Sequence, residues 1–193
     1  MRNKQAEIAK LLTSKQLKQQ AWLSQLFIGV IALALSWLLF DHIDEMGALF
    51  YWSTFQLLAW GIGSALVIVL LEILVTYTMP KSWGDDGGIN EKLFREGSYF
   101  EIVVLCMFVA VIEEWLFRGV LQTHFGLAAA SVIFALVHIR YLSKIALFIR
   151  VLGLSLWIGF IYWWTDNLLV VIVLHFIVNV IQACMIRSGR LVS

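Results

Sequence analysis

Residues 111–118, VIEEWLFR, place two carboxylates and a guanidinium inside an otherwise apolar stretch of the chain. The charged side chains are those of Glu113, Glu114 and Arg118. One charged side chain at the centre of a bilayer costs about 2.5–3.5 kcal/mol on insertion scales, so three unpaired ones would cost about 7–10 kcal/mol. We therefore expect these side chains to face the protein interior, to pair with one another and to line a polar cavity.

The composition is typical of an integral membrane protein. Of 193 residues, 61% are hydrophobic and 14% are charged, and the mean hydropathy is +0.87. Soluble domains average about 45–50% apolar and about 25% charged residues. We expect one membrane domain over residues 1–193, in contact with lipid and without a separate soluble domain. The net charge of +1, without a basic patch, gives no sign of nucleic-acid binding.

Apolar runs divide the chain into predicted membrane spans. A transmembrane helix needs about 20 apolar residues. The sequence thus predicts an all-α bundle of about six transmembrane helices, near 22–40, 55–79, 99–121, 126–139, 148–165 and 168–187. Within residues 1–21, Ile8, Leu11 and Leu12 share one helical face among basic residues, which predicts a short N-terminal interfacial helix. The polar motifs fall in a core at about 99–187.

Lysine and arginine are distributed unevenly among the predicted loops. Residues 1–21, 81–98, 140–147 and the C-terminus carry nearly all of them, whereas 41–47 and 165–167 carry acids and no Lys or Arg. The positive-inside rule therefore predicts that both termini are cytoplasmic. The short chain and compact loops indicate a prokaryotic cell-membrane protein.

Polar side chains recur at similar depth in later spans. With a rise of about 1.5 Å per residue, Glu113 lies about 21 Å from the cytoplasmic start of its span. His138 and Asn179 each lie about 18 Å from the opposite end of theirs. His175 and Asn179 are four residues apart and share one helix face. We expect three helices to bring these side chains together.

The helical positions of the two glutamates predict different roles. Glu114 and Arg118 have the favourable acid-before-base spacing of four residues, which predicts a buried ion pair. Glu113 is rotated by about 100° from Glu114, and is left free to act as a general base on water. One histidine can share the proton or protonate a leaving amine. Another histidine and an amide can stabilise an oxyanion. These groups suffice for peptide-bond hydrolysis without a covalent nucleophile.

The order of the motifs also resembles a known family. The chain carries three motifs in this order: Glu113-Glu114-x-x-x-Arg118, Phe134-x-x-x-His138 and His175-x-x-x-Asn179. In these it resembles the CPBP intramembrane proteases. That family joins type II CAAX prenyl endopeptidases with bacteriocin-processing and abortive-infection-like proteins. The resemblance covers about residues 110–182. It implies an intramembrane endopeptidase in which Glu113 and His138 activate water, while His175 and Asn179 bind the oxyanion.

The resemblance leaves metal dependence open. The family is often called metal-dependent, yet this chain has no H-E-x-x-H zinc motif. Glu113, His138 and His175 can supply three zinc ligands. We expect the metal-free glutamate mechanism, with no cofactor, and keep the zinc-dependent form as the alternative.

Other function classes stay open at the level of sequence. A non-catalytic membrane scaffold, such as an immunity or regulatory protein, would not need Glu113, His138, His175 or Asn179. A transporter or proton channel would also use intramembrane Glu and His, but neither internal repeats nor broken helices are predicted here. For a protease, the substrate can be a prenylated C-terminus, a bacteriocin leader or the helix of a membrane protein. A prokaryotic origin disfavours the first, and no oligomeric state is predicted.

Two further polar groups are given structural roles. Glu72, alone in the second span, is expected to make a structural hydrogen bond. Arg140, Lys144 and Arg150 are expected to anchor the chain at the lipid interface, because long basic side chains extend toward the head groups.

Overall fold

Every regular element in the computed structural model, which describes residues 11–80 and 83–190, is a helix. The all-α prediction is confirmed, since no strand occurs among these residues. In chain order the elements are α2 (Ser14–Leu39), α3 (Ile43–Ala48), α4 (Thr54–Gln56), η1 (Leu57–Gly63), α5 (Ser64–Thr78), α6 (Ile89–Phe94), α7 (Tyr99–Glu114), η3 (Trp115–Gln122), α8 (Thr123–Val137), η4 (Ile139–Tyr141), α9 (Ile145–Thr165) and α10 (Leu168–Arg187).

The first long helix, α2, begins at Ser14 and not near residue 22. Thr13 and Gln16 form a capping box there. The backbone N–H of Gln16 donates to Thr13 Oγ1 at 3.3 Å, and the backbone N–H of Thr13 donates to Gln16 Oε1 at 2.9 Å. These bonds satisfy backbone donors that a helix start leaves free. Most of the predicted interfacial helix lies in residues 1–10, outside the described residues, and Lys15 and Lys18 belong to α2.

Four helical stretches of the described chain are long and apolar enough to cross a membrane: Ser14–Leu39, Thr54–Thr78, Ile145–Thr165 and Leu168–Arg187. The chain is therefore an integral membrane protein by length and composition. The α7–η3 stretch carries the charged segment, and α8 has only 15 residues. The count of six crossings stays a prediction for these two stretches.

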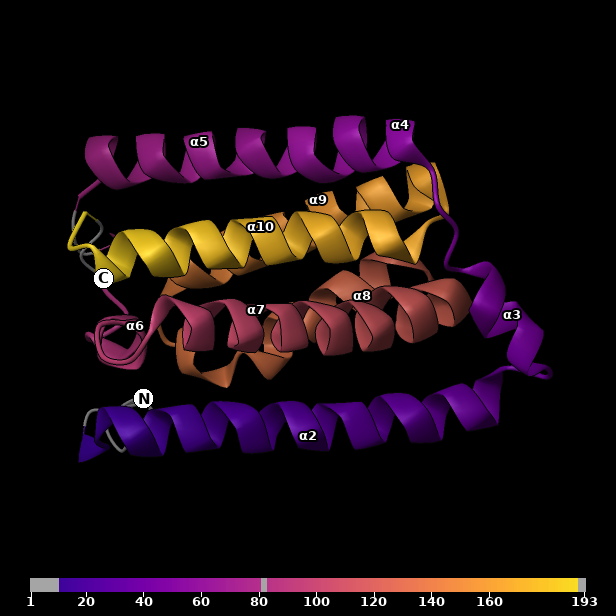
Figure 1. Ribbon diagram of the computed structural model, residues 1–193, viewed down its shortest axis with the longest axis horizontal. Helices are drawn as coiled ribbons and strands as arrows, with labels where there is room; N and C mark the ends of the chain where they lie inside the picture. The colour runs from indigo at the N-terminus through magenta and orange to yellow at the C-terminus, as the bar shows by residue number, and fades with distance from the viewer. Residues whose placement is uncertain (1–10, 81–82, 191–193) are drawn as a thin grey trace.

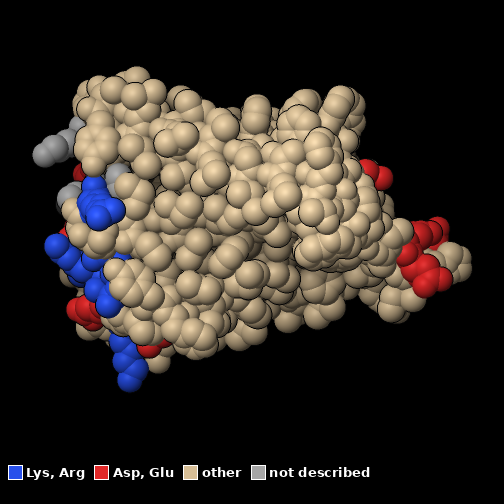
Figure 2. All heavy atoms as spheres, turned by 45° about the horizontal axis from the view of Figure 1, so that its top comes forward, with Lys and Arg blue, Asp and Glu red and all other residues tan. Residues whose placement is uncertain are grey.

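The long helices lie side by side along one axis, and the described ends of the chain lie at the same end of the bundle (Figure 1). Lys and Arg gather at that end, while the opposite end shows acidic residues beyond a broad uncharged band (Figure 2). The acidic end includes α3, with Asp44 and Glu45 in its first turn. This separation of charge is the pattern on which the predicted orientation rests.

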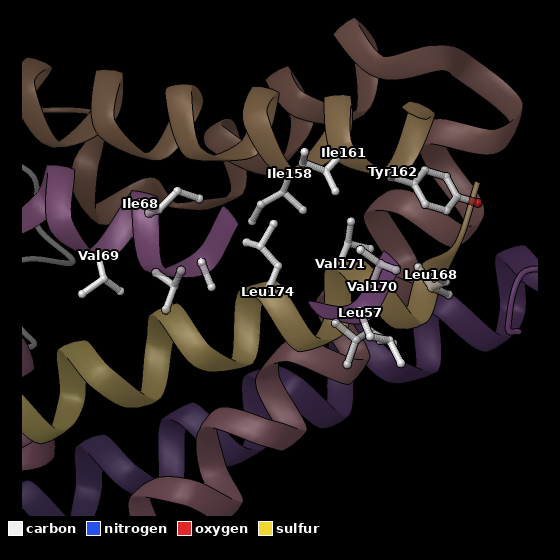
Figure 3. Close-up of a cluster of buried hydrophobic side chains, with 13 residues drawn as sticks. Leu57, Ile68, Val69, Ile158, Ile161, Tyr162, Leu168, Val170, Val171 and Leu174 are labelled. Atoms are coloured by element: carbon white, nitrogen blue, oxygen red, sulfur yellow. The ribbon is translucent and has the colours of Figure 1, made fainter. Parts of the chain in front are cut away.

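The largest apolar cluster lies between η1, α5, α9 and α10 (Figure 3). Ile158, Leu174 and Val178 are fully buried there. Lipid tails are as apolar as leucine, so close van der Waals packing, and not escape from water, holds such helices together. Gly61 permits that approach, because a Cβ atom there would lie 3.4 Å from the Val170 carbonyl oxygen.

The predicted turn at 165–167 joins α9 to α10 at the acidic end of the bundle. Asp166 has a φ of 49°, which ends α9. Asn167 caps α10 by accepting from the Leu169 amide at 3.1 Å, and its Nδ2 donates to the Tyr51 carbonyl oxygen at 2.9 Å. The turn is thereby tied to the segment that precedes α4.

Two spans that the sequence predicts as plain α-helices contain π-helical segments. These are η1, Leu57–Gly63, and η3, Trp115–Gln122. The second begins directly after Glu114. Such wide turns often occur at functional sites, and this one re-aims the side chains that follow the two glutamates. The chain then turns at Gly126, whose φ is 83°.

Candidate functional site

A fully buried ion pair joins α7 to η3. Arg118 Nη1 lies 3.2 Å from Glu114 Oε1, and the two side chains are 1% and 0% exposed. Arg118 Nη2 also donates to the carbonyl oxygen and to Oγ of Ser155 on α9, each at 2.9 Å. The guanidinium carbon lies 4.9 Å from the centre of the Phe134 ring. Arg118 thus links three helices through one charge.

His175 on α10 shares the same carboxylate oxygen. Its Nδ1 lies 2.5 Å from Glu114 Oε1, and the residue is 3% exposed. An ionised carboxylate only accepts hydrogen bonds, so Nδ1 carries the proton in this contact. Glu114 is therefore held by Arg118 and His175, and the ring of His175 presents Nε2 away from it.

Glu113 has a different environment from its neighbour. It is 7% exposed, and its Oε1 accepts a hydrogen bond from Gln25 Nε2 on α2 at 2.6 Å. Among the described residues its Oε2 has no hydrogen-bond partner. The helix rotation between adjacent residues accounts for this difference, since it turns Glu113 toward α2 and Glu114 toward α10. One carboxylate oxygen of Glu113 is left available for water or substrate.

His138 stands where α8 ends. Its Nδ1 donates to the Phe134 carbonyl oxygen at 2.7 Å, and its ring stacks on Tyr141 with centroids 6.1 Å apart and an interplanar angle of 8°. A hydrogen bond from Nδ1 fixes the tautomer in which Nε2 has a free lone pair. Nε2 of a neutral His138 can thus accept a proton.

Phe134 connects the two histidines. Its ring centroid lies 4.7 Å from that of His138 and 6.4 Å from that of His175. The sequence motif Phe134-x-x-x-His138 therefore has a packing role: the buried ring contacts both imidazoles and the Arg118 guanidinium. The structure brings Glu114, Arg118 and His175 into direct contact, and Phe134 places His138 beside this group.

Asn179 follows His175 by one helical turn and is partly exposed. Its side chain makes no hydrogen bond with any of the described residues. Both ends of its amide are free to bind a ligand on the face that it shares with His175.

A cavity of about 540 Å³ lies between α5, α9, α10 and the loop before α6. Glu113, His138, His175 and Asn179 do not line it, but Tyr141, which stacks on His138, and Gln182, three residues after Asn179, do. Glu72 and Arg150 form an ion pair in its wall. The pairing agrees with the structural contact that the sequence predicts for Glu72 and supplies its partner, whereas Arg150, predicted to anchor the chain at the lipid interface, instead contacts this carboxylate.

Glu113, His138 and His175 do not form a zinc site in this arrangement. No group of three or more His, Cys, Asp and Glu side chains within residues 11–80 and 83–190 lies close enough together to hold a metal ion. The Nδ1 contacts of His175 and His138 leave Nε2 of each ring free, the usual state of a metal-binding histidine. The misfit with zinc is one of placement, because the described carboxylates and imidazoles are not gathered into one set of ligands.

Comparison with known proteins places the chain in a family. A family model described as type II CAAX prenyl endopeptidase Rce1-like matches residues 95–181, a range that contains all three motifs. The chain belongs to the Rce1-like family. It is also 41% identical over 165 residues to the "Uncharacterized protein YpbD" of Bacillus subtilis strain 168, covering 86% of this chain and 87% of that protein. No solved structure matches the chain. Membership of the Rce1-like family implies a protease.

The sequence did not predict a role in this Rce1-like site for three further residues. Gln25 and Ser155 contact the charged segment from α2 and α9. Both are polar side chains within apolar spans, a pattern from which the sequence could have predicted them. The third residue is Gln122, whose Nε2 donates to the Gly159 carbonyl oxygen at 2.7 Å. This bond joins η3 to α9 one helical turn after the Arg118–Ser155 contact.

Proposed function

We propose that this protein is an intramembrane endopeptidase that hydrolyses a peptide bond of a membrane-associated peptide or protein through water activated by Glu113. The observation that carries the proposal is the difference between the adjacent glutamates. Glu114 is fully buried: its Oε1 contacts both Arg118 and His175, and its Oε2 is enclosed without a partner among the described residues. Glu113 has no cation of the described chain within hydrogen-bond distance, and its Oε2, unlike that of Glu114, is not among the enclosed atoms. A buried, oriented carboxylate with a free oxygen suits proton abstraction from water.

His138 completes the water-activating pair in this proposal. With Nδ1 held by the Phe134 carbonyl oxygen, Nε2 can accept the proton that Glu113 has taken, or can pass it to the leaving amine. Stacking against Tyr141 and Phe134 fixes the plane of the ring. The proton then reaches the amine without leaving the site.

His175 and Asn179 are the proposed oxyanion donors. Because Nδ1–H of His175 points at Glu114, Nε2 can donate only when the ring is doubly protonated. The proposed oxyanion role of His175 therefore requires a proton on Nε2 as well as on Nδ1. Nitrogen-15 NMR of labelled histidine measures which ring nitrogens carry protons, and a bare Nε2 would contradict this role.

Access from the basic end of the bundle supports a cytoplasmic approach of the substrate. The 540 Å³ cavity is lined at this end by Asp85, Asn90 and Arg190. Tyr141 and Gln182 in its wall adjoin His138 and Asn179. We propose that a membrane-anchored peptide enters this cavity and reaches the four polar residues when Tyr141 moves aside.

A comparison of cell proteomes tests the proposal and separates it from a scaffold role. Cells carrying Glu113→Gln should accumulate an uncleaved membrane-associated protein that wild-type cells process. Glu101→Gln, the same substitution at an exposed position on α7, is the matched control and should process it normally. Identical processing in Glu113→Gln and wild-type cells would favour a scaffold.

A further inference from the structure

Gln25 is a buried amide on an otherwise apolar or small-residue face of α2. The buried positions that follow it along this face are Gly29, Ala32 and Ser36. They lie against α7 and η3: a Cβ atom at Gly29 would be 3.4 Å from Ile112 Cδ1, and Ser36 Oγ accepts from Trp115 Nε1 at 3.1 Å. The small residues let α2 approach closely enough for the amide to reach Glu113.

The amide makes one hydrogen bond where it could make more. Nε2 of Gln25 donates to Glu113 Oε1 at 2.6 Å, across 88 positions of sequence. Its Oε1 is buried and has no partner within the described chain. A buried unpaired carbonyl oxygen destabilises the fold. Methionine would fill the same space without that cost, so the bond to Glu113 distinguishes glutamine from an apolar side chain here.

We propose that Gln25 is a positioning residue for the base: its Nε2 fixes Glu113 Oε1 and thereby aims Oε2 at the attacking water. This inference rests on the proposed function of Glu113. A carboxylate on a long side chain has several rotamers, and a hydrogen bond at one oxygen selects among them. A misplacement of about 1 Å at a reacting group can lower a rate by about 100-fold.

The test compares Gln25→Met with Ser36→Ala in purified full-length protein. Gln25→Met keeps the shape and removes the donor, whereas Ser36→Ala removes a different side-chain hydrogen bond of α2, the one to Trp115. With the peptide whose cleavage is lost in Glu113→Gln cells, Gln25→Met should lower kcat by about 10–100-fold and leave KM unchanged. Ser36→Ala should keep the wild-type kcat.

Infrared spectroscopy gives a second measurement that needs no substrate. The carboxylate band of Glu113 is identified as the difference between wild type and Glu113→Gln. In Gln25→Met this band should shift, because one oxygen loses its hydrogen bond, and in Ser36→Ala it should stay in place. If Gln25→Met does not fold, Gln25→Asn retains the amide but is one methylene too short to reach Glu113, and should shift the band in the same way.

An unshifted Glu113 band in a folded Gln25 variant would overturn the inference, as would a wild-type kcat. Failure of the proposed function can be told apart from failure of the Gln25 inference, because Glu113→Gln itself would then retain activity. A band shift together with an active Glu113→Gln variant would keep the Gln25 contact and reject the catalytic role of Glu113. A parallel loss of stability in Gln25→Met and Ser36→Ala, without a band shift, would make Gln25 a packing residue.

Discussion

Glu113 and Glu114 are joined by one peptide bond, yet their carboxylates contact different helices. Glu113 accepts from Gln25 on α2, and Glu114 contacts Arg118 on η3 and His175 on α10. Adjacent residues of a helix point about 100° apart, so two consecutive glutamates can contact different neighbouring helices. The Glu114 carboxylate is held by two donors at Oε1 and is fully enclosed, while Glu113 Oε2 is neither hydrogen-bonded to a described residue nor enclosed.

Removing one member of the buried pair should destabilise the protein strongly. Arg118→Met leaves Glu114 buried without its permanent cation, and breaking such a pair costs about 3–5 kcal/mol. Glu114→Met strands Arg118 in the same way. The melting temperature in detergent should fall for each single variant, and the double variant should recover part of the loss. Wild-type melting temperatures for both single variants would show that the pair does not support the fold.

Asn179→Ala should slow turnover more than it weakens substrate binding. The proposed role of this amide is to donate to an oxyanion, a charge that develops only in the transition state. Loss of one such donor lowers kcat by about 10²–10³-fold. Steady-state kinetics with the identified peptide measure the split between kcat and KM. A rise in KM at constant kcat would instead make Asn179 a substrate-binding residue.

Cysteine labelling should confirm the predicted orientation. In a variant that lacks Cys106 and Cys184, a new cysteine at Asp44 should react with an impermeant reagent added outside intact cells. A cysteine at Glu96 should react only after the cells are opened. Both positions are exposed, so reactivity reports the side of the membrane. The reverse pattern would place both termini outside.

Metal removal should leave activity unchanged. The described residues offer no cluster of three or more metal-binding side chains. The purified active protein should therefore contain much less than one zinc per chain and should tolerate chelators. Stoichiometric zinc, with activity lost on chelation and restored by zinc, would establish the alternative mechanism and reassign Glu113.

Local sequence rules predict much of the fold because they depend on neighbouring residues. The last helix occupies the predicted residues 168–187, and the Glu114–Arg118 contact follows from a spacing of four. The contacts that complete the site join distant segments. Gln25 and Glu113 are 88 residues apart, and Glu114 and His175 are 61 apart. No periodicity encodes these pairings, because they depend on how the helices pack. The π-helical turn after Glu114 likewise has no residue signature.

The rate of peptide hydrolysis by purified Glu113→Gln tests the central claim most directly. With the peptide identified from cells, this variant should keep its fold and lose about 10²–10⁴-fold in rate, the range expected for a general base. Glu101→Gln, measured beside it, should hydrolyse the peptide at the wild-type rate. A folded Glu113→Gln protein that keeps more than about a tenth of the wild-type rate would contradict the assignment of Glu113 as the base.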